Sequence, residues 1–519
     1  MKEVRLRFAP SPTGYVHIGG LRTALYNYLY ARGQKGKFIL RIEDTDRTRY
    51  VEGAIENLIR ELKWADIEID EGISLDESGN IIDVGDCKPY IQSERVKQGI
   101  YDKYIEKLIE EGKAYYCFCT KERLDHIREA QKADGKVAKY DGFCRGVSLE
   151  EAKERIANGE EHVVRMKLPA NKDISFDDAI KGRITINTDD MDDQVLIKSD
   201  GFPTYHFAVV VDDHEMGVTH VVRGDEWLPS TPKHVFLYEA LGWEAPKYVH
   251  LPTVLNKSGK KLSKRNDDAS VEDFRKKGYL PEGLINYLAL VGWSPETNEE
   301  ILSMDELIDQ FSFERVSKSG GVFDSEKLDW VNAHYVKALE IPKLAKYIKP
   351  YMIEAGLIDE DFSNEKLELI AQTFQESIHK FSEIVEQSEF LFKDKIEIVE
   401  EDAIEMASGE QVPSLIEAFK EELSTVDEVD EEFAKTIMKK IQKKTGVKGK
   451  NLYMPVRAVL TGNVHGPELV NIIQILGKEG LENRLNQFHQ GEWYEKQSTY
   501  RNSSNIFFNS SVLRILCAF

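Results

Sequence analysis

The segment 11–20 near the N-terminus carries residues suited to phosphate chemistry. It contains an imidazole, His17, followed by two glycines, Gly19 and Gly20. The imidazole can donate a hydrogen bond to a phosphate that gains negative charge during a reaction. The glycines lack side chains, so a flat base can lie directly against the backbone. Alone, so short a pattern is more often an ordinary glycine turn.

A second segment, 261–265, supplies positive charge near the middle of the chain. Lys261 and Lys264 follow the flexible pair Ser258-Gly259. Ammonium groups on a flexible loop can follow a pyrophosphate as it leaves. By itself the segment would be interpreted as a solvated basic turn. The two segments together, in this order, predict a site for phosphate chemistry that neither segment predicts alone.

The elements around the first segment predict a nucleotide-binding fold. Residues 4–9 alternate apolar and charged side chains, and a run of prolines and glycine then breaks the chain. From Leu21 onward, apolar residues recur at helical spacing. A strand, a tight turn and a helix start direct unpaired N–H groups and the positive end of the helix dipole at an anion.

The two segments are similar to the two signature sequences of class I aminoacyl-tRNA synthetases. From Arg5 to about Trp330 the chain resembles the bacterial type of glutamyl-tRNA synthetase. The motifs that carry the resemblance occur in family order, and they are RFAPSPTG (7–14), LRIEDTDR (40–47), PYIQSER (89–95), GFPTYHF (201–207), VDDH (211–214), VRGDEW (222–227) and FDSEKL (323–328).

This resemblance implies an activity and its substrates. The enzyme would join L-glutamate to tRNA(Glu) through a glutamyl-adenylate, with ATP bound as its Mg²⁺ complex and with release of AMP and diphosphate. Whether glutamine tRNA, tRNA(Gln), is also charged depends on a few anticodon contacts, and this question stays open.

The residues themselves fit glutamate, which carries two carboxylates and one ammonium group. Arg7 and Arg223 are each expected at the carboxyl end of a strand, where open α/β sheets bind ligands. Arginine suits planar carboxylate groups, and Glu43 can hold the ammonium. The alternative for Arg223 is an ion pair with Asp225 or Asp212. By resemblance, the glutamate pocket also includes Ala9, Ser11, Tyr205 and Val209, although many family members have Asn at the last position.

The resemblance also assigns residues to ATP and to catalysis. The catalytic residues would be His17, Lys261 and Lys264. The ATP-binding residues would be His17, Gly19, Gly20, Glu226, Val254 and Lys264. Gly20 stands where most class I enzymes have a second histidine, and this replacement is usual in the glutamate branch, so it favours glutamate over glutamine.

The acidic pair Asp212-Asp213 and three cysteines could suggest metal sites. We expect the acids at a strand end, where neighbouring side chains point opposite ways and support loops. Cys117, Cys119 and Cys144 resemble the zinc site of some glutamyl enzymes, which have a histidine where this chain has Gly146. Structural zinc takes four ligands. Three thiolates with a fourth ligand not evident, or free thiols, both remain open.

The sequence predicts an α/β fold: a Rossmann-like parallel-sheet catalytic domain with a mixed α+β insertion, followed by an all-α C-terminal anticodon-binding domain. The insertion is expected to contain helices over 94–111 and 122–134, and the helical half to contain helices over 365–386 and 412–423. The expected divisions are 1–85 and 205–240 (core), 86–204 (insertion that grips the acceptor end), 241–332 (stem-contact region with the lysine loop), 333–486 (anticodon domain) and 487–519 (a tail that matches nothing in the family).

Composition limits the partners. The formal net charge of −22 is unusual for an RNA-binding protein, but binding is local. Seven lysines between 435 and 450 form a basic helix and loop that could lie against the anticodon arm; the alternative is a solvated face. The five sparse cysteines fit a reducing cytoplasm. No apolar run reaches the length of a membrane span, and a monomer is expected.

Three rival interpretations use the same first half. A glutaminyl-tRNA synthetase would carry β-barrel anticodon domains, which the helical second half argues against. A glutamyl transferase acting on a modified base in tRNA would stop near residue 300. A catalytically dead paralogue would be expected to lose His17 or the loop lysines, and these are present.

Overall fold

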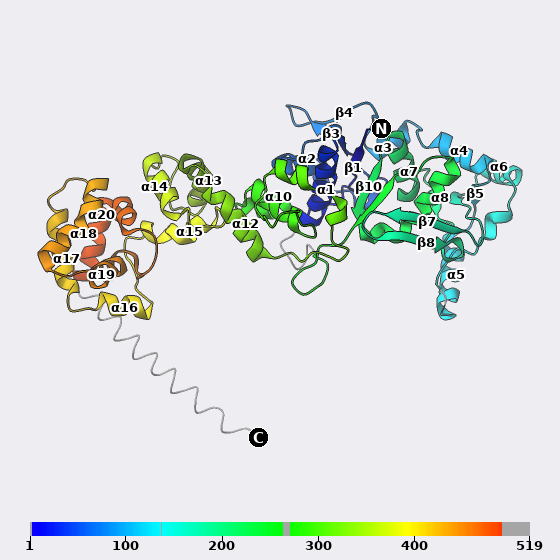
Figure 1. The fold of residues 1–519 in the computed structure, drawn as a ribbon. Coiled ribbons are helices and arrows are strands. Elements are labelled where there is room, and N and C mark those ends of the chain that lie inside the picture. The colour runs from blue at the N-terminus through cyan, green and yellow to red at the C-terminus, as the bar shows by residue number, and fades with distance from the viewer. Residues whose placement is uncertain (1–2, 136, 263–269, 490–519) are drawn as a thin grey trace, which may run out of the picture. The chain divides into compact units, whose positions relative to one another are not determined.

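The structure is a computed structural model, and it describes residues 3–135, 137–262 and 270–489. It divides into two compact units, the first ending at His334 and the second beginning at Tyr335. Figure 1 labels the helices and strands of both units. Lys264 and the tail beyond 489 lie outside the described residues.

Unit 1 is built on an eight-stranded sheet with the order β4-β3-β2-β1-β10-β11-β7-β8. The strands from β3 to β7 in this order are parallel, and β4 and β8 are antiparallel at the two edges. The strands are β1 (Arg5–Phe8), β2 (Lys37–Leu40), β3 (Glu71–Leu75), β4 (Ile81–Val84), β7 (Asp173–Asp178), β8 (Gly182–Asn187), β10 (His220–Gly224) and β11 (Lys247–Leu251).

The sheet takes in more of the chain than the sequence predicts. The expected core ends at 240, but β11 continues the sheet beyond that point. The β7–β8 hairpin comes from the expected insertion and pairs with β11 instead. Such distant pairings leave no local signal in the sequence, because they depend on which edge of the sheet is open.

Helix α1 (Ile18–Gly33) follows β1 directly, as expected, and packs against β1, β2 and β10. Its apolar residues are fully buried, among them Leu21, Ala24 and Leu25. Strands β1 and β10 are neighbours although the chain between them is long. The α1 helix therefore begins at a point where the sheet order reverses, and this is where open α/β sheets bind ligands.

The strand expected around Asp212-Asp213 is wrong. Residues Tyr205–Glu215 form helix α7, whose middle residues are buried. Three successive valines favour a strand locally. Burial against α8 (Thr231–Leu241) and the rest of this core stabilises a helix instead.

The insertion also contains a small three-stranded sheet, β5 (Ala114–Cys117), β6 (Val163–Met166) and β9 (Val195–Ile197), in the order β5-β6-β9. The single helix expected over 94–111 is wrong, because α3 (Gln92–Lys97) ends before α4 (Asp102–Glu110) begins. Gly99 between them has a φ of +68°, which a helix cannot contain. Helices α5 (Lys121–Ala133) and α6 (Leu149–Ala157) complete this region.

Unit 1 ends with helices α9 (Val271–Lys276), α10 (Pro281–Leu290) and α11 (Met304–Gln310), and α12 (Ser325–Lys337) carries the chain into unit 2. The described part of unit 2 is all-helical. Its helices are α13 (Ile341–Glu354), α14 (Asn364–Phe374), α15 (Glu383–Ser388), α16 (Glu401–Ala407), α17 (Val412–Leu423), α18 (Glu431–Thr445), α19 (Lys450–Thr461) and α20 (Leu469–His489).

The helix expected over 412–423 is confirmed, whereas that expected over 365–386 is two helices, α14 and α15. A core of buried residues from α17, α18, α19 and α20 holds the last four helices of this unit together. Among the described residues, no helix is long and apolar enough to cross a membrane.

Candidate active site

A cavity of about 420 Å³ lies at the carboxyl ends of β1, β10 and β11. It brings together most of the residues that the sequence singles out. These are Arg7, Ala9, Ser11, His17, Gly19, Gly20, Glu43, Tyr205, Arg223, Glu226, Val254 and Lys261.

One of the expected site residues, Val209, does not line this cavity, and a second, Lys264, lies outside the described residues. Val209 is buried in the core that α7 shares with α8, one helical turn beyond Tyr205, and it is not among the residues lining the cavity. Lys264 lies outside the described residues, whereas Lys261 borders the cavity and is exposed.

His17 is the N-cap residue of α1. Its backbone is extended, and its Nδ1 accepts a hydrogen bond from the Gly20 N–H at 3.2 Å. In a neutral imidazole the proton must then be on Nε2, which makes Nε2 the donor. A Cβ at Gly19 would lie 2.9 Å from Cε1 of the His17 ring, so a larger residue there would have to displace the ring.

The Arg7 side of the cavity is a network of opposite charges. Arg7 Nε and Nη2 donate to the two oxygens of Asp213 at 2.9 and 3.2 Å. Arg41 donates to Glu43 at 2.9 Å and lies 2.8 Å from Asp213. All four side chains are buried. Burial alone would raise the pKa of the Asp213 carboxyl, but Arg7 and Arg41 hold that pKa below its ordinary value.

Asp212 supports the same region from the other side of α7. It accepts hydrogen bonds from Arg95 at 2.7 Å, Gln92 at 2.8 Å and Tyr101 at 3.0 Å. Asp212 and Asp213 therefore differ in most of their partners but share Arg41, whose Nε lies 3.9 Å from Asp212, and they make these contacts from a helix instead of the expected strand end. Within the described residues, the group with metal-ligand geometry contains neither of them.

Glu43 lies at the border between the charge network and the cavity. Burial raises the pKa of its carboxyl, more than Arg41 and Arg7 lower it. One of its oxygens accepts from Arg41. The residue lines the cavity, so its remaining oxygen can accept from an ammonium group.

The Arg223 side is different, because neutral groups surround the guanidinium. Arg223 is buried, and it donates to His250 Nε2 at 3.2 Å, Tyr205 Oη at 3.1 Å, Thr231 Oγ1 at 2.8 Å and His234 Nδ1 at 3.3 Å. Over the described chain, none of its hydrogen-bond partners is a carboxylate. The ion pair with Asp225 or Asp212 does not form: Asp225 contacts Lys181 and Thr253, and Asp212 contacts Arg95.

Sequence reasoning missed several residues of this site. Thr231, His234 and His250 come from α8 and β11, and no local motif marks them. Arg22 on α1 donates to the Val291 carbonyl at 2.8 Å and to the Pro252 carbonyl, and it ties the helix to the end of β11. Trp227 packs on Tyr205 with ring centroids 4.2 Å apart.

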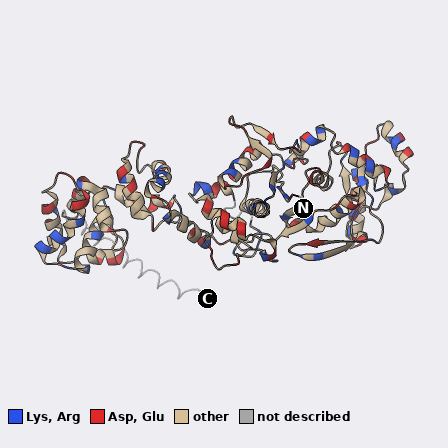
Figure 2. Cartoon of the chain, turned by 45° about the horizontal axis from the view of Figure 1, so that its top comes forward, with Lys and Arg blue, Asp and Glu red and all other residues tan. Residues whose placement is uncertain are grey.

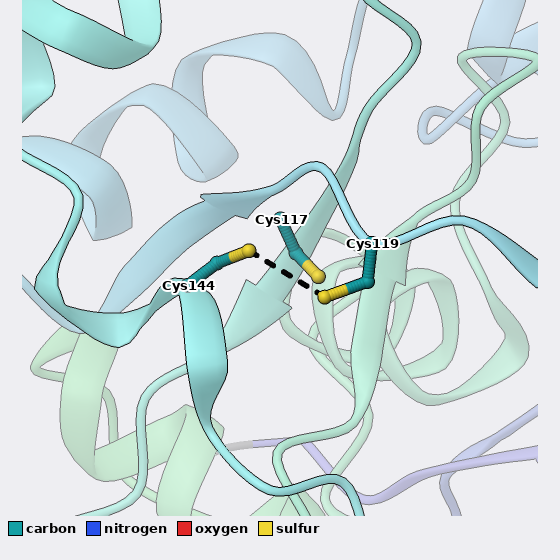
Figure 3. A group of neighbouring side chains, drawn as sticks. All are labelled: Cys117, Cys119 and Cys144. Carbon is teal, nitrogen blue, oxygen red and sulfur yellow. Dashed lines mark hydrogen bonds between the residues drawn. The ribbon is translucent and has the colours of Figure 1, made fainter. Parts of the chain in front are cut away.

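A separate cluster contains three cysteines of the insertion. The sulfurs of Cys117, Cys119 and Cys144 all lie within 4.8 Å of one another, and the Cys119 and Cys144 sulfurs are 3.6 Å apart (Figure 3). The hydroxyl of Tyr140 lies 3.3 Å from Cys117 Sγ and 3.5 Å from Cys119 Sγ. A tetrahedral zinc with bonds of about 2.3 Å separates its sulfurs by roughly 3.8 Å, so the donor set fits that ion.

Comparison with known proteins agrees with this geometry. The model of the family "tRNA synthetases class I (E and Q), catalytic domain" matches residues 3–330, and that of an anticodon binding domain matches 343–489. The chain therefore belongs to the class I tRNA synthetases for glutamate and glutamine, and it is a ligase that uses ATP to charge tRNA.

The relatives that it matches are named as glutamate–tRNA ligases. The glutamate–tRNA ligase of Finegoldia magna is 65% identical over 94% of this chain and 99% of its own length. That of Clostridioides difficile is 54% identical over 93% and 98%. A crystal structure of a glutamate tRNA ligase from Elizabethkingia meningosepticum, in complex with its amino acid, has a TM-score of 0.83 and 38% identity, and covers 94% of this chain and 99% of its own.

Proposed function

We propose that this chain is a glutamate–tRNA ligase, which joins L-glutamate to tRNA(Glu) through a glutamyl-adenylate and releases AMP and diphosphate. The observation that carries the proposal is the composition of the cavity at the end of β1 and β10. It combines the N-terminus of α1 with a buried guanidinium whose hydrogen-bond partners among the described residues are all neutral. Such a cation accommodates a substrate carboxylate, which glutamine lacks at its side chain.

Each residue of the site takes one role in this proposal. Arg223 and Arg7 face the glutamate carboxylates, Glu43 accepts from the ammonium, and Ala9, Ser11 and Tyr205 complete the pocket. His17 Nε2–H donates to the α-phosphate as charge develops there. Gly19, Gly20, Glu226 and Val254 border ATP, which enters with Mg²⁺, and Lys261 and Lys264 neutralise the departing diphosphate.

An aminoacylation assay tests the proposal. The purified protein is given ATP, Mg²⁺, either glutamate or glutamine, and either tRNA(Glu) or tRNA(Gln). Glutamate should be attached to tRNA(Glu), and glutamine to neither tRNA. Attachment of glutamine would overturn the assignment, and attachment of glutamate to tRNA(Gln) would widen the tRNA substrate.

The proposed partners are tRNA(Glu), glutamate and ATP, and we propose that the protein acts as a monomer in the cytoplasm. The free cysteines of the described chain agree with a reducing compartment. Gel filtration with light scattering would measure the oligomeric state, and a dimer mass would contradict the monomer.

We also propose that Cys117, Cys119 and Cys144 would hold a structural zinc ion; the Tyr140 hydroxyl is the oxygen found within 3.5 Å of two of these sulfurs. The spacing of the sulfurs supports this. Atomic emission on the purified protein should find about one zinc per chain. Cys119→Ser should lose it, whereas Cys87→Ser, which changes a cysteine outside the cluster, should keep it. A wild-type protein purified without chelator and free of zinc would contradict the proposal.

A further inference from the structure

Three buried side chains, those of Arg223, His250 and Asp178, form a chain of contacts from the cavity to the β7–β8 hairpin. Arg223 Nε donates to His250 Nε2 at 3.2 Å, and His250 Nδ1 lies 2.7 Å from an oxygen of Asp178. Arg223 and His250 are register partners on the parallel strands β10 and β11. Asp178 is the last residue of β7, which pairs with β11.

The hydrogen-bond partners determine which nitrogen of each histidine carries the proton. His250 Nε2 accepts from Arg223, so Nδ1 carries the proton and donates it to Asp178. His234 Nδ1 accepts from Arg223, so His234 Nε2–H donates to His206 Nδ1 at 3.0 Å. Both histidines are therefore neutral acceptors toward the same guanidinium.

Burial favours the neutral form of both histidine rings. His250 has no exposed surface, His234 is 2% exposed and Arg223 is 6% exposed. Burial and the Arg223 charge hold the pKa of His234 well below its ordinary value. A protonated ring would place a donor and a positive charge against the guanidinium, so neutral rings are favoured.

Asp178 supplies the only carboxylate in this chain of contacts, as far as the described residues show. Its side chain is buried, and its pKa lies below the ordinary value because hydrogen bonds from His250 and the backbone outweigh the effect of burial. The carboxylate does not touch Arg223; the His250 ring lies between the two charges. The guanidinium thus gains a countercharge without a direct ion pair that would compete with a substrate carboxylate.

We propose that Asp178 and His250 are positioning residues for glutamate binding: Asp178 fixes the proton of His250 on Nδ1, and His250 then holds Arg223 as a neutral acceptor. This inference rests on the proposed role of Arg223 as a ligand of the glutamate carboxylate. It assigns a function to the β7–β8 hairpin, whose turn orders the Asp178 carboxylate through the N–H groups of Ile180 and Lys181 at 3.0 and 2.8 Å.

We call the chain of contacts from Asp178 through His250 to Arg223 the relay. Two substitutions of His250 separate its contact with Asp178 from its contact with Arg223. In His250→Asn the amide can still donate to Asp178, but it cannot reach Arg223. In His250→Gln the side-chain oxygen can reach Arg223. Loss of the acceptor for a charged donor should raise the glutamate KM roughly tenfold in His250→Asn. His250→Gln should restore most of the affinity, and the ATP KM and kcat should change little in both.

The control variant is His220→Asn. Like His250, His220 is a buried histidine in a strand of the sheet, here β10, but it contacts Thr219 and makes no hydrogen bond with Asp178, His250 or Arg223 within the described chain. It should leave both KM values near those of the unmodified protein. Equal rises in the glutamate and ATP KM for His250→Asn, with no rescue by His250→Gln, would show a purely structural role and overturn the relay.

A double-mutant cycle with Arg223→Gln separates failure of the relay from failure of the proposed function. If His250 acts through Arg223, adding His250→Asn to Arg223→Gln should not raise the glutamate KM further. Additive effects would overturn the relay. If Arg223→Gln alone leaves the glutamate KM unchanged, Arg223 is not a glutamate ligand, and the proposed role of Arg223 fails together with the relay.

Discussion

Arg7 and Arg223 end neighbouring strands at the same cavity, but their surroundings are opposite. Arg7 is held by the Asp213 carboxylate, which also binds Arg41. Arg223 is held by a phenol, a threonine hydroxyl and two neutral imidazoles. Both side chains are buried. Similar arginines at similar positions therefore differ in the charge that remains for a ligand.

The difference indicates that the Arg7 side contributes more to the stability of the fold and that the Arg223 side has more charge available to bind a ligand. On the Arg7 side, three arginines (Arg7, Arg41 and Arg95) face three carboxylates (Glu43, Asp212 and Asp213). The network pairs each positive charge with a carboxylate before any ligand arrives, so it holds β1, β2 and α7 together in addition to placing Arg7 and Glu43 at the cavity. On the Arg223 side, the positive charge has no direct countercharge among the described residues. A carboxylate ligand would supply the missing countercharge to Arg223.

The largest expected effect is the loss of unfolding free energy when a carboxylate of the Arg7 network is removed. Asp213→Asn removes the carboxylate shared by Arg7 and Arg41 and leaves two buried cations undercompensated. Removing one partner of a buried pair costs about 3–5 kcal/mol of unfolding free energy. Urea unfolding should measure this loss. Asp177→Asn, which removes an exposed partner of Arg183, should leave the unfolding midpoint unchanged. A small effect of Asp213→Asn would contradict the structural role of this side.

Arg223→Gln tests the binding side, with the next largest effect. The glutamate carboxylate would lose a charge-assisted contact, which costs roughly 2–3 kcal/mol, or about a hundredfold in glutamate KM. The ATP KM should change little, and the unfolding midpoint should fall less than in Asp213→Asn. Steady-state kinetics with each substrate varied in turn provides the measurement. Parallel losses of ATP and glutamate affinity would make Arg223 a structural residue as well.

The sequence predicted the Arg7 and Arg223 positions because both follow strand patterns that local periodicity reveals. It did not predict their partners. His234 and His250 lie on elements that pack around Arg223 only after the sheet has formed, and the β7–β8 hairpin was assigned to a separate insertion. The strand expected at Asp212-Asp213 was wrong because burial on α7 overrode the local preference of the valines before it.

Val209 shows the limit of resemblance as a guide. The resemblance assigns a pocket residue to this position, but the valine is buried in the core that α7 shares with α8. A side chain without polar atoms gains more by packing in the core than by bordering a polar cavity. The motifs therefore located the cavity, whereas its outline required the packed structure.

As pH falls, the stability contributed by the Arg223 side and that contributed by the Arg7 side should be lost over different pH ranges. Burial, Lys233 and Arg223 lower the pKa of His206 from 6.5 to about 4. The unfolded chain binds this proton below pH 6.5 while the folded chain resists it, so stability is retained above pH 6.5 and lost as pH falls toward 4. The loss is at most about 1.4 kcal/mol per pH unit for each such histidine. Asp213, whose pKa is held low, contributes stability that is lost only below its ordinary value of 3.8.

His206→Gln tests whether this histidine causes the loss of stability between pH 6.5 and 5. Its urea midpoint should fall less than that of the unmodified protein between pH 6.5 and 5, since one half-buried neutral histidine has been removed. His126→Gln, an exposed position on α5, is the matched control and should follow the unmodified protein. If all three proteins lose stability in parallel over this range, the histidines beside Arg223 are not the groups that titrate.

Unit 2 repeats the contrast between neutralised and available cations on a smaller scale. On α18, Lys440 and Lys444 lie against Glu422 of α17, with Lys444 Nζ 2.6 Å from its carboxylate. Lys439 and Lys443 lie one helical turn apart, and the described chain shows no ion pair for either. Figure 2 shows both signs of charge along the helices of this unit. The expected tRNA contacts of the 435–450 cluster should therefore come from Lys439 and Lys443 more than from Lys440 and Lys444.

The smallest predicted effect tests this division through salt dependence. Each lost phosphate contact should lower the slope of log affinity against log salt by about 0.7–0.9. Lys439→Gln combined with Lys443→Gln should therefore reduce the slope by roughly 1.5. The matched pair Lys440→Gln with Lys444→Gln should change it less, because those charges are already partly neutralised by Glu422. The dissociation constant for tRNA(Glu) is measured for all three proteins across a salt series. Equal slopes for all three would make α18 a solvated face, and larger flattening by the Lys440 and Lys444 pair would show that tRNA displaces their glutamate partners.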